Sequence, residues 1–217
     1  MRDRLLEQIA CKAMVLGNDR IVVAIDGVDG AGKTTFADEL ATVIRALGQP
    51  VIQASIDGFH HPKDIRYLRG RNSPEGYFLD SYDYDMFRRD LLIPFRTGAH
   101  IVQTAGFNHR TNQKVSAVAK PYQRSILLVD GIFLHRNELI DCWDLSLFLD
   151  VPFVISYSRM AARDGSNVDP FAPENARYLE GQRMYLRQCN PRDRATILID
   201  NADFKAPRIL PQRLSAS

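Results

Sequence analysis

The sequence predicts an α/β fold, built on a mostly parallel sheet with helices on both faces. Short, continuous apolar runs alternate along the chain with longer segments whose apolar residues recur at helical spacing. Such runs are typical of strands buried on both faces, and their alternation with helices favours parallel strands joined by crossover helices. Ligands bind these folds at the carboxyl ends of the strands, so we expect the functional site at that edge.

The first quarter of the chain predicts two helices and two strands. Residues 1–16 place their leucine, isoleucine and methionine side chains on one face, which is typical of an amphipathic helix. The apolar run 21–25 predicts a buried strand. Residues 33–47 predict a helix, which a glycine and a proline then end, and residues 51–56 predict a second strand.

The middle of the chain is less regular. Residues 57–82 hold several glycines and prolines together with three arginines, and we predict a long loop there on the substrate side. Loops of this length in compact domains are usually functional. We predict a helix over residues 83–96 and a hairpin over residues 100–119, where apolar and polar residues loosely alternate.

The last part of the chain returns to regular alternation. Residues 125–129 and 145–151 predict two more buried strands, because each is a short apolar run. Residues 153–163 and 174–189 predict helices, and residues 196–199 predict a final strand.

Composition limits the classes of function. The length of 217 residues suits one domain, spanning residues 1–217. The 28 basic and 26 acidic residues leave a formal charge of +2, which favours neither nucleic acid nor a membrane surface as partner. No apolar run approaches the roughly 18 residues of a membrane span, and the amino terminus lacks a signal peptide pattern. Three cysteines without a close pair argue against disulfides and zinc, so we expect a cytoplasmic protein.

The first strand leads directly into a glycine-rich loop of the form G-x-x-x-x-G-K-[ST]. Its glycines let backbone amides converge on phosphate oxygens, and the following helix adds its positive amino end. Lys33 can reach the β- and γ-phosphates, and the Thr34 hydroxyl can bind Mg²⁺. The loop predicts a nucleoside triphosphate site, without choosing between a kinase, an ATPase and a GTPase switch. The residues assigned to it are Gly27, Asp29, Gly30, Ala31, Gly32, Lys33, Thr34 and Thr35.

Two aspartates close predicted strands at the same edge of the sheet. Asp130 follows an apolar run, which is the Walker B pattern, and we assign it with Thr34 to Mg²⁺. We assign Asp57 as the general base that accepts the proton of an attacking hydroxyl. A phosphate acceptor would be repelled by Asp57, so a hydroxyl acceptor is favoured. The alternative for both aspartates is a turn-capping role before glycine.

Two arginines on the predicted helix 153–163 suggest a lid over residues 159–173. Arg159 and Arg163 are four residues apart and therefore share a helix face. Arg163 could neutralise charge on the transferred phosphoryl group, and Arg159 could bind the triphosphate. A solvated basic face is the alternative.

Other polar side chains have two interpretations. His60 lies beside Asp57 and could contact substrate or be a solvated loop residue. Tyr178, Gln182 and Tyr185 share a face of the late helix, which we assign to packing in preference to a nucleoside pocket. We assign His135 to the surface or to packing.

Several of these segments resemble the uridine kinase and phosphoribulokinase group of P-loop kinases. They are the loop 27–35 and the segments Asp57–His60, Ser81–Asp83, Val129–Ile132 and Phe107–Thr111. The resemblance implies a P-loop NTPase fold, ATP with Mg²⁺ as donor and lid arginines at Arg159 and Arg163. It also implies substrate contacts by Phe59, His60, Tyr82, Asp83, His109 and Arg110.

The acceptor is the open point of this resemblance. The family usually carries Glu where this chain has Asp130, and Tyr where it has Phe107. Residues 57–62 and 191–199 are also similar to bacterial pantothenate kinase. We therefore expect transfer of the γ-phosphoryl group to the 5′-hydroxyl of uridine or cytidine, with pantothenate or a sugar as the alternative. A regulatory P-loop ATPase without a small-molecule acceptor is the alternative of another class, and ATP and GTP both remain open as donor.

Overall fold

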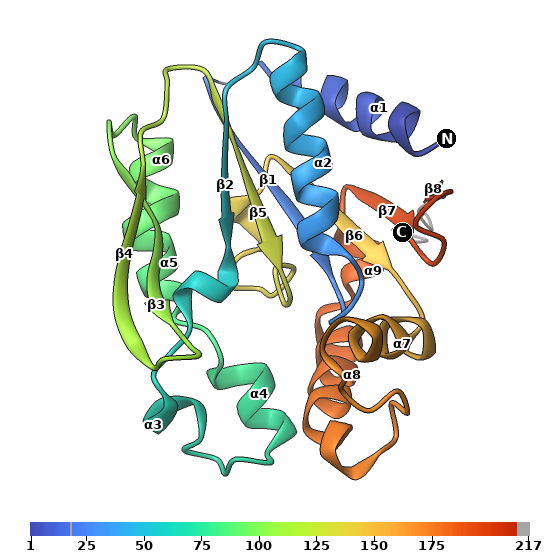
Figure 1. The fold of residues 1–217 in the computed structure, drawn as a ribbon. Helices are drawn as coiled ribbons and strands as arrows, with labels where there is room; N and C mark the ends of the chain where they lie inside the picture. Colours follow the sequence, from blue (N-terminus) through green and yellow to red (C-terminus); the bar gives the residue numbers. More distant parts are fainter. Residues whose placement is uncertain (18, 212–217) are drawn as a thin grey trace, which may run out of the picture.

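A six-stranded sheet forms the centre of the molecule (Figure 1). The computed structural model describes residues 1–17 and 19–211. The sheet has the strand order β2-β5-β1-β6-β7-β8, in which all neighbours are parallel except the last pair. A mostly parallel sheet flanked by helices is thus confirmed. The strands are β1 (Arg20–Gly27), β2 (Val51–Ser55), β5 (Ser125–Gly131), β6 (Leu145–Asp150), β7 (Ile197–Asp200) and β8 (Arg208–Leu210).

The central strand β1 supplies two hydrophobic cores, because successive residues of a strand face opposite sides of the sheet. Ile21, Val23 and Ile25 pack under α1 (Arg2–Met14) and α2 (Lys33–Ala46). Val22 and Ala24 belong to the core on the other face, which is rich in phenylalanine and tyrosine from the middle and the end of the chain. This alternation explains the unbroken apolar run in the sequence.

Residues 57–82 differ from the predicted loop. They contain most of a 3₁₀ helix (Ile56–Phe59) and two short α-helices, α3 (Lys63–Arg66) and α4 (Pro74–Asp80). Helix α4 begins because the Ser73 side chain accepts a hydrogen bond from Gly76 N, and proline occupies the first helical position. The prediction was wrong here because that proline starts a helix instead of breaking one.

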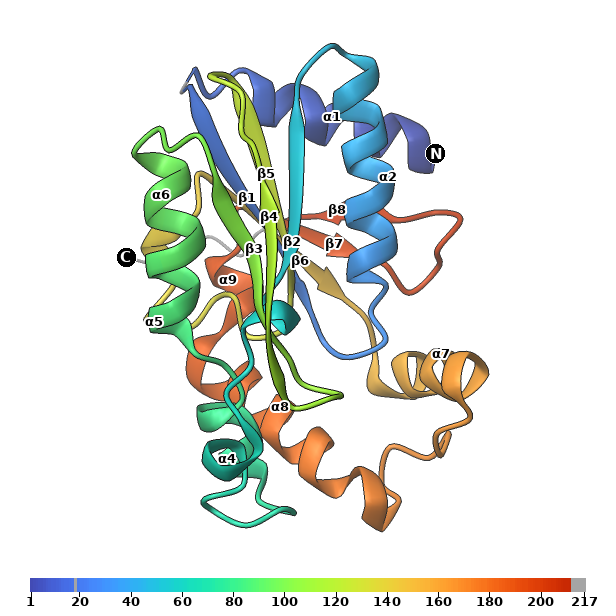
Figure 2. The same ribbon diagram turned by 60° about the vertical axis from the view of Figure 1, so that its left-hand side comes forward.

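The predicted helix 83–96 forms with a local widening. It consists of α5 (Tyr84–Phe87), a π-helical turn (Arg88–Leu92) and α6 (Ile93–Arg96). Pro94 lacks an N–H and would crowd the carbonyl four residues earlier, so the wider turn accommodates it. The predicted hairpin is also present, as β3 (Val102–Asn108) and β4 (Gln113–Ala119), and it runs alongside β2 (Figure 2).

Three α-helices follow β6 in the described part of the chain. They are α7 (Phe153–Asp164), α8 (Ala176–Cys189) and α9 (Pro191–Arg194). Helices α4, α7 and α8 lie beyond the carboxyl ends of the parallel strands, at the edge of the sheet where the site is expected (Figure 1). The short edge strand β8 was not predicted. Among the described residues, none of the helices is long and apolar enough to cross a membrane.

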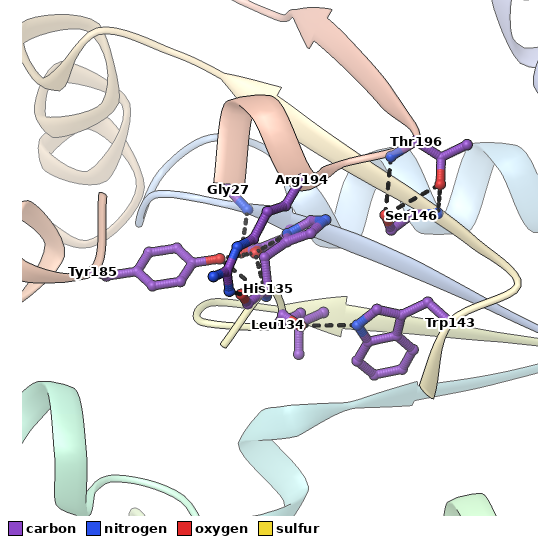
Figure 3. A network of polar contacts seen from close by, with 9 residues as sticks. Gly27, Leu134, His135, Trp143, Ser146, Tyr185, Arg194 and Thr196 are labelled. Atoms are coloured by element: carbon purple, nitrogen blue, oxygen red, sulfur yellow. Dashed lines mark hydrogen bonds and ion pairs between the residues drawn. The ribbon is translucent and has the colours of Figure 1, made fainter. Parts of the chain in front are cut away.

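A buried polar network fixes the carboxyl end of β1 (Figure 3). Asp26 is fully buried, and its carboxylate accepts hydrogen bonds from Gly27 N (2.7 Å), from His135 N and Nδ1 (3.2 and 2.7 Å) and from the Tyr185 hydroxyl. Arg194 in turn donates to the carbonyl of His135 at 3.2 Å. His135, assigned from the sequence to surface or packing, is thus a buried partner of Asp26, and the network ties the start of the phosphate loop to α8.

Candidate active site

A cavity of about 680 Å³ opens at the carboxyl edge of the sheet, where the fold class predicts a ligand. The phosphate loop, the ends of β2 and β5, the hairpin and helices α7 and α8 all contribute to its walls. The lining residues are Asp29, Gly30, Lys33, Thr34, Asp57, His109, Arg110, Asp130, Gly131, Ile132, Tyr157, Met160, Arg163, Asp164, Ser166, Asn175 and Tyr178.

The phosphate loop adopts a curled backbone that only glycine tolerates at two positions. Gly30 has φ +71°, and a Cβ there would lie 2.3 Å from the carbonyl oxygen of Ser156. Gly32 has φ +87° and forms the amino-terminal cap of α2. Lys33 donates from Nζ to the carbonyl of Val28 at 2.9 Å, so its ammonium lies across the loop. The amino end of α2 and this ammonium together give the cavity floor a positive potential suited to phosphates.

The Thr34 hydroxyl and the Asp130 carboxylate meet beside the loop. Thr34 donates to Asp130 Oδ2 at 2.7 Å, although 96 residues separate the two in sequence. Asp130 is 8% exposed, and burial raises its pKa, while the Thr34 hydrogen bond and the Lys33 charge act in the opposite direction. Two hard oxygen ligands of this kind suit Mg²⁺, which keeps several waters and binds substrate phosphates. The described residues contain no cluster of three or more His, Cys, Asp and Glu side chains that could hold a metal by themselves.

Replacing Thr34 by alanine should raise the Mg²⁺ concentration needed for half-maximal activity by about tenfold or more, because one oxygen ligand is lost. A Mg²⁺ titration of the reaction rate measures this change. Thr42→Ala is the matched control, since Thr42 lies exposed on the same helix and donates only to the Asp38 carbonyl. An unchanged titration in Thr34→Ala would remove Thr34 as a ligand.

Asp57 presents a half-exposed carboxylate to the cavity, with 58% of its side chain accessible. The Tyr82 hydroxyl donates to Asp57 Oδ1 at 2.9 Å, and Nε2 of His60 lies 3.7 Å from the same oxygen. Burial lowers the pKa of His60 to about 4, against the opposing effect of Asp57. His60 is therefore neutral at physiological pH and adds no positive charge beside Asp57.

The predicted acceptor contacts His109 and Arg110 line the cavity next to Asp57. The ring of His109 packs edge-on against His60 at 4.5 Å, and His60 stacks on Tyr82 at 4.4 Å. Burial lowers the pKa of His109. Asp57, His109 and Arg110 line the cavity, whereas His60 and Tyr82 contact this group from behind and are not among the lining residues. Substrate contact by these residues stays a prediction.

Three predicted site residues have other roles in the structure. Phe59 is fully buried and packs against Phe87 at 5.1 Å, so it belongs to the core. Asp83 caps helix α5 by accepting from Met86 N at 2.8 Å, and it lines a separate cavity. A cap residue must face its own helix end, and Asp83 is not among the residues that line the cavity with Asp57.

Arg159 is the third of these residues. Its guanidinium donates to the carbonyls of Asn201 and Ala202 at 2.9 and 2.8 Å and lies 3.6 Å from the centre of the Phe204 ring. The segment after β7 therefore holds this side chain, which is not among the residues that line the cavity. Its role in binding the triphosphate stays a prediction. Arg163 does line the cavity, where it pairs with Asp164 at 2.8 Å and lowers the pKa of that carboxyl to about 2.

Several lining residues were not predicted. Tyr157 is buried, and its hydroxyl has no hydrogen-bond partner within residues 1–17 and 19–211. Tyr178 lines the cavity from α8, whereas its helix-face neighbours Gln182 and Tyr185 are buried and bond to the phosphate loop and to Asp26. The shared spacing of these three residues was the only signal in the sequence, and it does not reveal which element they meet.

The chain matches the Phosphoribulokinase / Uridine kinase family over residues 22–167. It belongs to this family. A uridine kinase of Leuconostoc citreum is 25% identical over 150 residues, which cover 69% of this chain and 70% of the relative. A thymidylate kinase of Xylella fastidiosa is 31% identical over 159 residues, which cover 70% of each protein.

A solved structure shares the fold over most of the chain. A possible uridine kinase from Bacillus stearothermophilus has a TM-score of 0.71 at 22% identity, covering 91% of this chain and 99% of its own. The predicted P-loop kinase fold and the family resemblance are confirmed. The protein is a phosphotransferase whose family acts on small molecules with an alcohol group as acceptor.

Proposed function

We propose that the protein transfers the γ-phosphoryl group of ATP, bound with Mg²⁺, to the 5′-hydroxyl of uridine or cytidine in the cytoplasm. The observation that carries this proposal is the placement of Asp57. Its partly exposed carboxylate opens into the same cavity as the phosphate loop and the Thr34–Asp130 pair. A proton acceptor beside a triphosphate site serves a hydroxyl acceptor and has no use in simple nucleotide binding.

The roles of the residues follow from this geometry. Loop amides and the Lys33 ammonium bind the β- and γ-phosphates and hold the γ-phosphorus in line with the acceptor oxygen. Asp57 takes the proton of the hydroxyl as its oxygen bonds to phosphorus and the bond to the leaving ADP breaks. Arg163 lines the cavity and can balance charge on the transferred group. Mg²⁺, held by Thr34 and Asp130, would neutralise charge on the phosphate oxygens.

One observation keeps a second acceptor class open. The resemblance to uridine kinases assigned Asp83 to the nucleoside, and this carboxylate instead caps α5 beside another cavity. An acceptor that needs no contact with Asp83, such as pantothenate or a sugar, is therefore the alternative within the same reaction class.

ADP release from ATP and Mg²⁺ tests the proposal directly. The rate is measured without acceptor and then with uridine, cytidine, pantothenate, several sugars and thymidylate in turn. We expect uridine or cytidine to raise the rate and to appear as the 5′-monophosphate. A rise with pantothenate or a sugar alone would replace the nucleoside and keep the reaction. A slow rate that no acceptor changes would favour a regulatory ATPase.

A further inference from the structure

Two carboxylates in the cavity, those of Asp57 and Asp29, each accept a hydrogen bond from a buried tyrosine hydroxyl. The proposed reaction gives a role only to Asp57. Asp57 Oδ1 accepts a hydrogen bond from the Tyr82 hydroxyl at 2.9 Å, and Asp29 Oδ2 accepts one from the Tyr77 hydroxyl at 2.8 Å. Both tyrosines are buried, at 4% and 8% exposure. Each carboxylate lines the same cavity and keeps a second oxygen that has no hydrogen-bond partner within residues 1–17 and 19–211.

Asp29 is unusual because a negative side chain within a phosphate loop repels the donor. Its backbone N–H is also already occupied, since it donates to Oε1 of Gln182 on α8 at 2.8 Å. Gln182 is fully buried, and its amide nitrogen donates to the Tyr178 carbonyl at 3.0 Å, which fixes its orientation. Both the backbone and the side chain of Asp29 are thus held by α4 and α8 and not by the phosphate loop.

The two tyrosines are rigid hydrogen-bond donors. Burial raises the pKa of Tyr77 and of Tyr82 well above the ordinary value, and the nearby carboxylates act in the same direction. Both rings contact Phe133, at 5.4 and 6.3 Å between centres. On α8, a Cβ at Gly181 would lie 2.7 Å from the Tyr77 ring, so the helix leaves that ring no room to move. Each hydroxyl therefore fixes one oxygen of its carboxylate.

We propose that Asp29 is a second acceptor-binding carboxylate, which takes a hydrogen bond from a hydroxyl of the acceptor other than the one that reacts. Tyr77 and Gln182 are its positioning residues, as Tyr82 is for Asp57. The acceptor accordingly carries at least two hydroxyl groups, of which Asp57 serves the reacting one. This inference rests on the proposed function, and on a nucleoside the second group is a ribose hydroxyl.

The test compares uridine with 2′-deoxyuridine and 3′-deoxyuridine in the wild-type protein and in Asp29→Asn. Loss of a hydrogen bond to a charged group should raise the KM of uridine in Asp29→Asn by about tenfold to a hundredfold. We expect kcat and the KM of ATP to change by less than about threefold, because the contact is equal in ground and transition states. With the wild-type protein, one of the two deoxyuridines should have a KM raised by the same factor relative to uridine. With Asp29→Asn, the KM of that deoxyuridine should equal the KM of uridine.

A second variant keeps the test valid if Asp29→Asn disturbs the fold of the phosphate loop. Tyr77→Phe keeps Asp29 and removes only its positioning hydrogen bond, so we expect the KM of uridine to rise by a smaller factor at unchanged KM of ATP. Tyr122→Phe is the control, because Tyr122 is 72% exposed and lies outside the cavity lining.

Two results would overturn the inference and leave the proposed function standing. One is a rise in the KM of ATP instead of uridine, which would assign Asp29 to the donor. The other is that Asp29→Asn and the wild-type protein show the same ratio of the KM of each deoxyuridine to the KM of uridine. If the wild-type protein phosphorylates only another acceptor, the nucleoside proposal fails. The wild-type protein and Asp29→Asn are then compared with that acceptor and with an analogue that lacks one non-reacting hydroxyl. An equal ratio of the two KM values in both proteins would reject the role of Asp29.

Discussion

The Asp57→Asn variant should lose about 10²–10⁴ in turnover, or roughly 3–5 kcal/mol of transition-state stabilisation, while ATP still binds. Asparagine keeps the shape of the side chain and can still accept the Tyr82 hydrogen bond, but it cannot take up the proton of the acceptor hydroxyl. Steady-state ADP release in the presence of the acceptor measures the loss, and equilibrium binding of ATP measures what is retained.

Asp64→Asn is the matched control for this experiment. Asp64 lies exposed on α3 and outside the cavity lining. We expect normal turnover in that variant. Near-normal turnover in Asp57→Asn would remove the general base from the mechanism, whichever acceptor is used.

The second large effect concerns stability. Asp26→Ala should lower the free energy of unfolding by at least about 3 kcal/mol, because the buried donors of Gly27, His135 and Tyr185 lose their acceptor at once. For a chain of this size, that corresponds to a fall in Tm of roughly 6–12 °C. Urea unfolding followed by circular dichroism measures the free energy directly.

Tyr185→Phe gives a graded comparison, since it removes one donor and leaves the carboxylate in place. We expect it to cost about 1 kcal/mol. Asp141→Asn, at an exposed position, should leave stability unchanged. If the free energy of unfolding of Asp26→Ala lies within about 1 kcal/mol of the wild-type value, the hydrogen bonds of the network contribute little to stability.

The sequence predicts that Thr34 and Asp130 lie together beside the phosphate loop, and the structure brings them into contact. The phosphate loop is one contiguous segment, and Thr34 follows it directly. Asp130 could be added because β1 and β5 are parallel neighbours, with Ile25 opposite Asp130 in the register. Parallel strands that end together bring distant residues to one edge, and the pattern of apolar runs already contains that information.

The contacts that hold the rest of the site in place were harder to predict for a physical reason. These polar contacts join elements that meet only when the chain folds, such as Gln182 with Asp29 and Tyr185 with Asp26. Arg159 is a second example, because its spacing from Arg163 predicts a shared helix face but not the segment that this face contacts. The ring of Phe204, from a segment beyond β7, nevertheless holds its guanidinium. Helical spacing identifies a face and leaves its partner unknown.

The alternation of β1 also has a consequence for insertions and deletions. Ile25 faces the core under α1 and α2, and the next residue, Asp26, meets Tyr185 on the opposite side. Gain or loss of a single residue within β1 would exchange the two faces of every position beyond the change. The carboxylate would then enter the apolar core, and α8 would lose its connection to the phosphate loop. We therefore expect relatives that share this network to vary in length in the loops around β1 and to keep the strand itself constant.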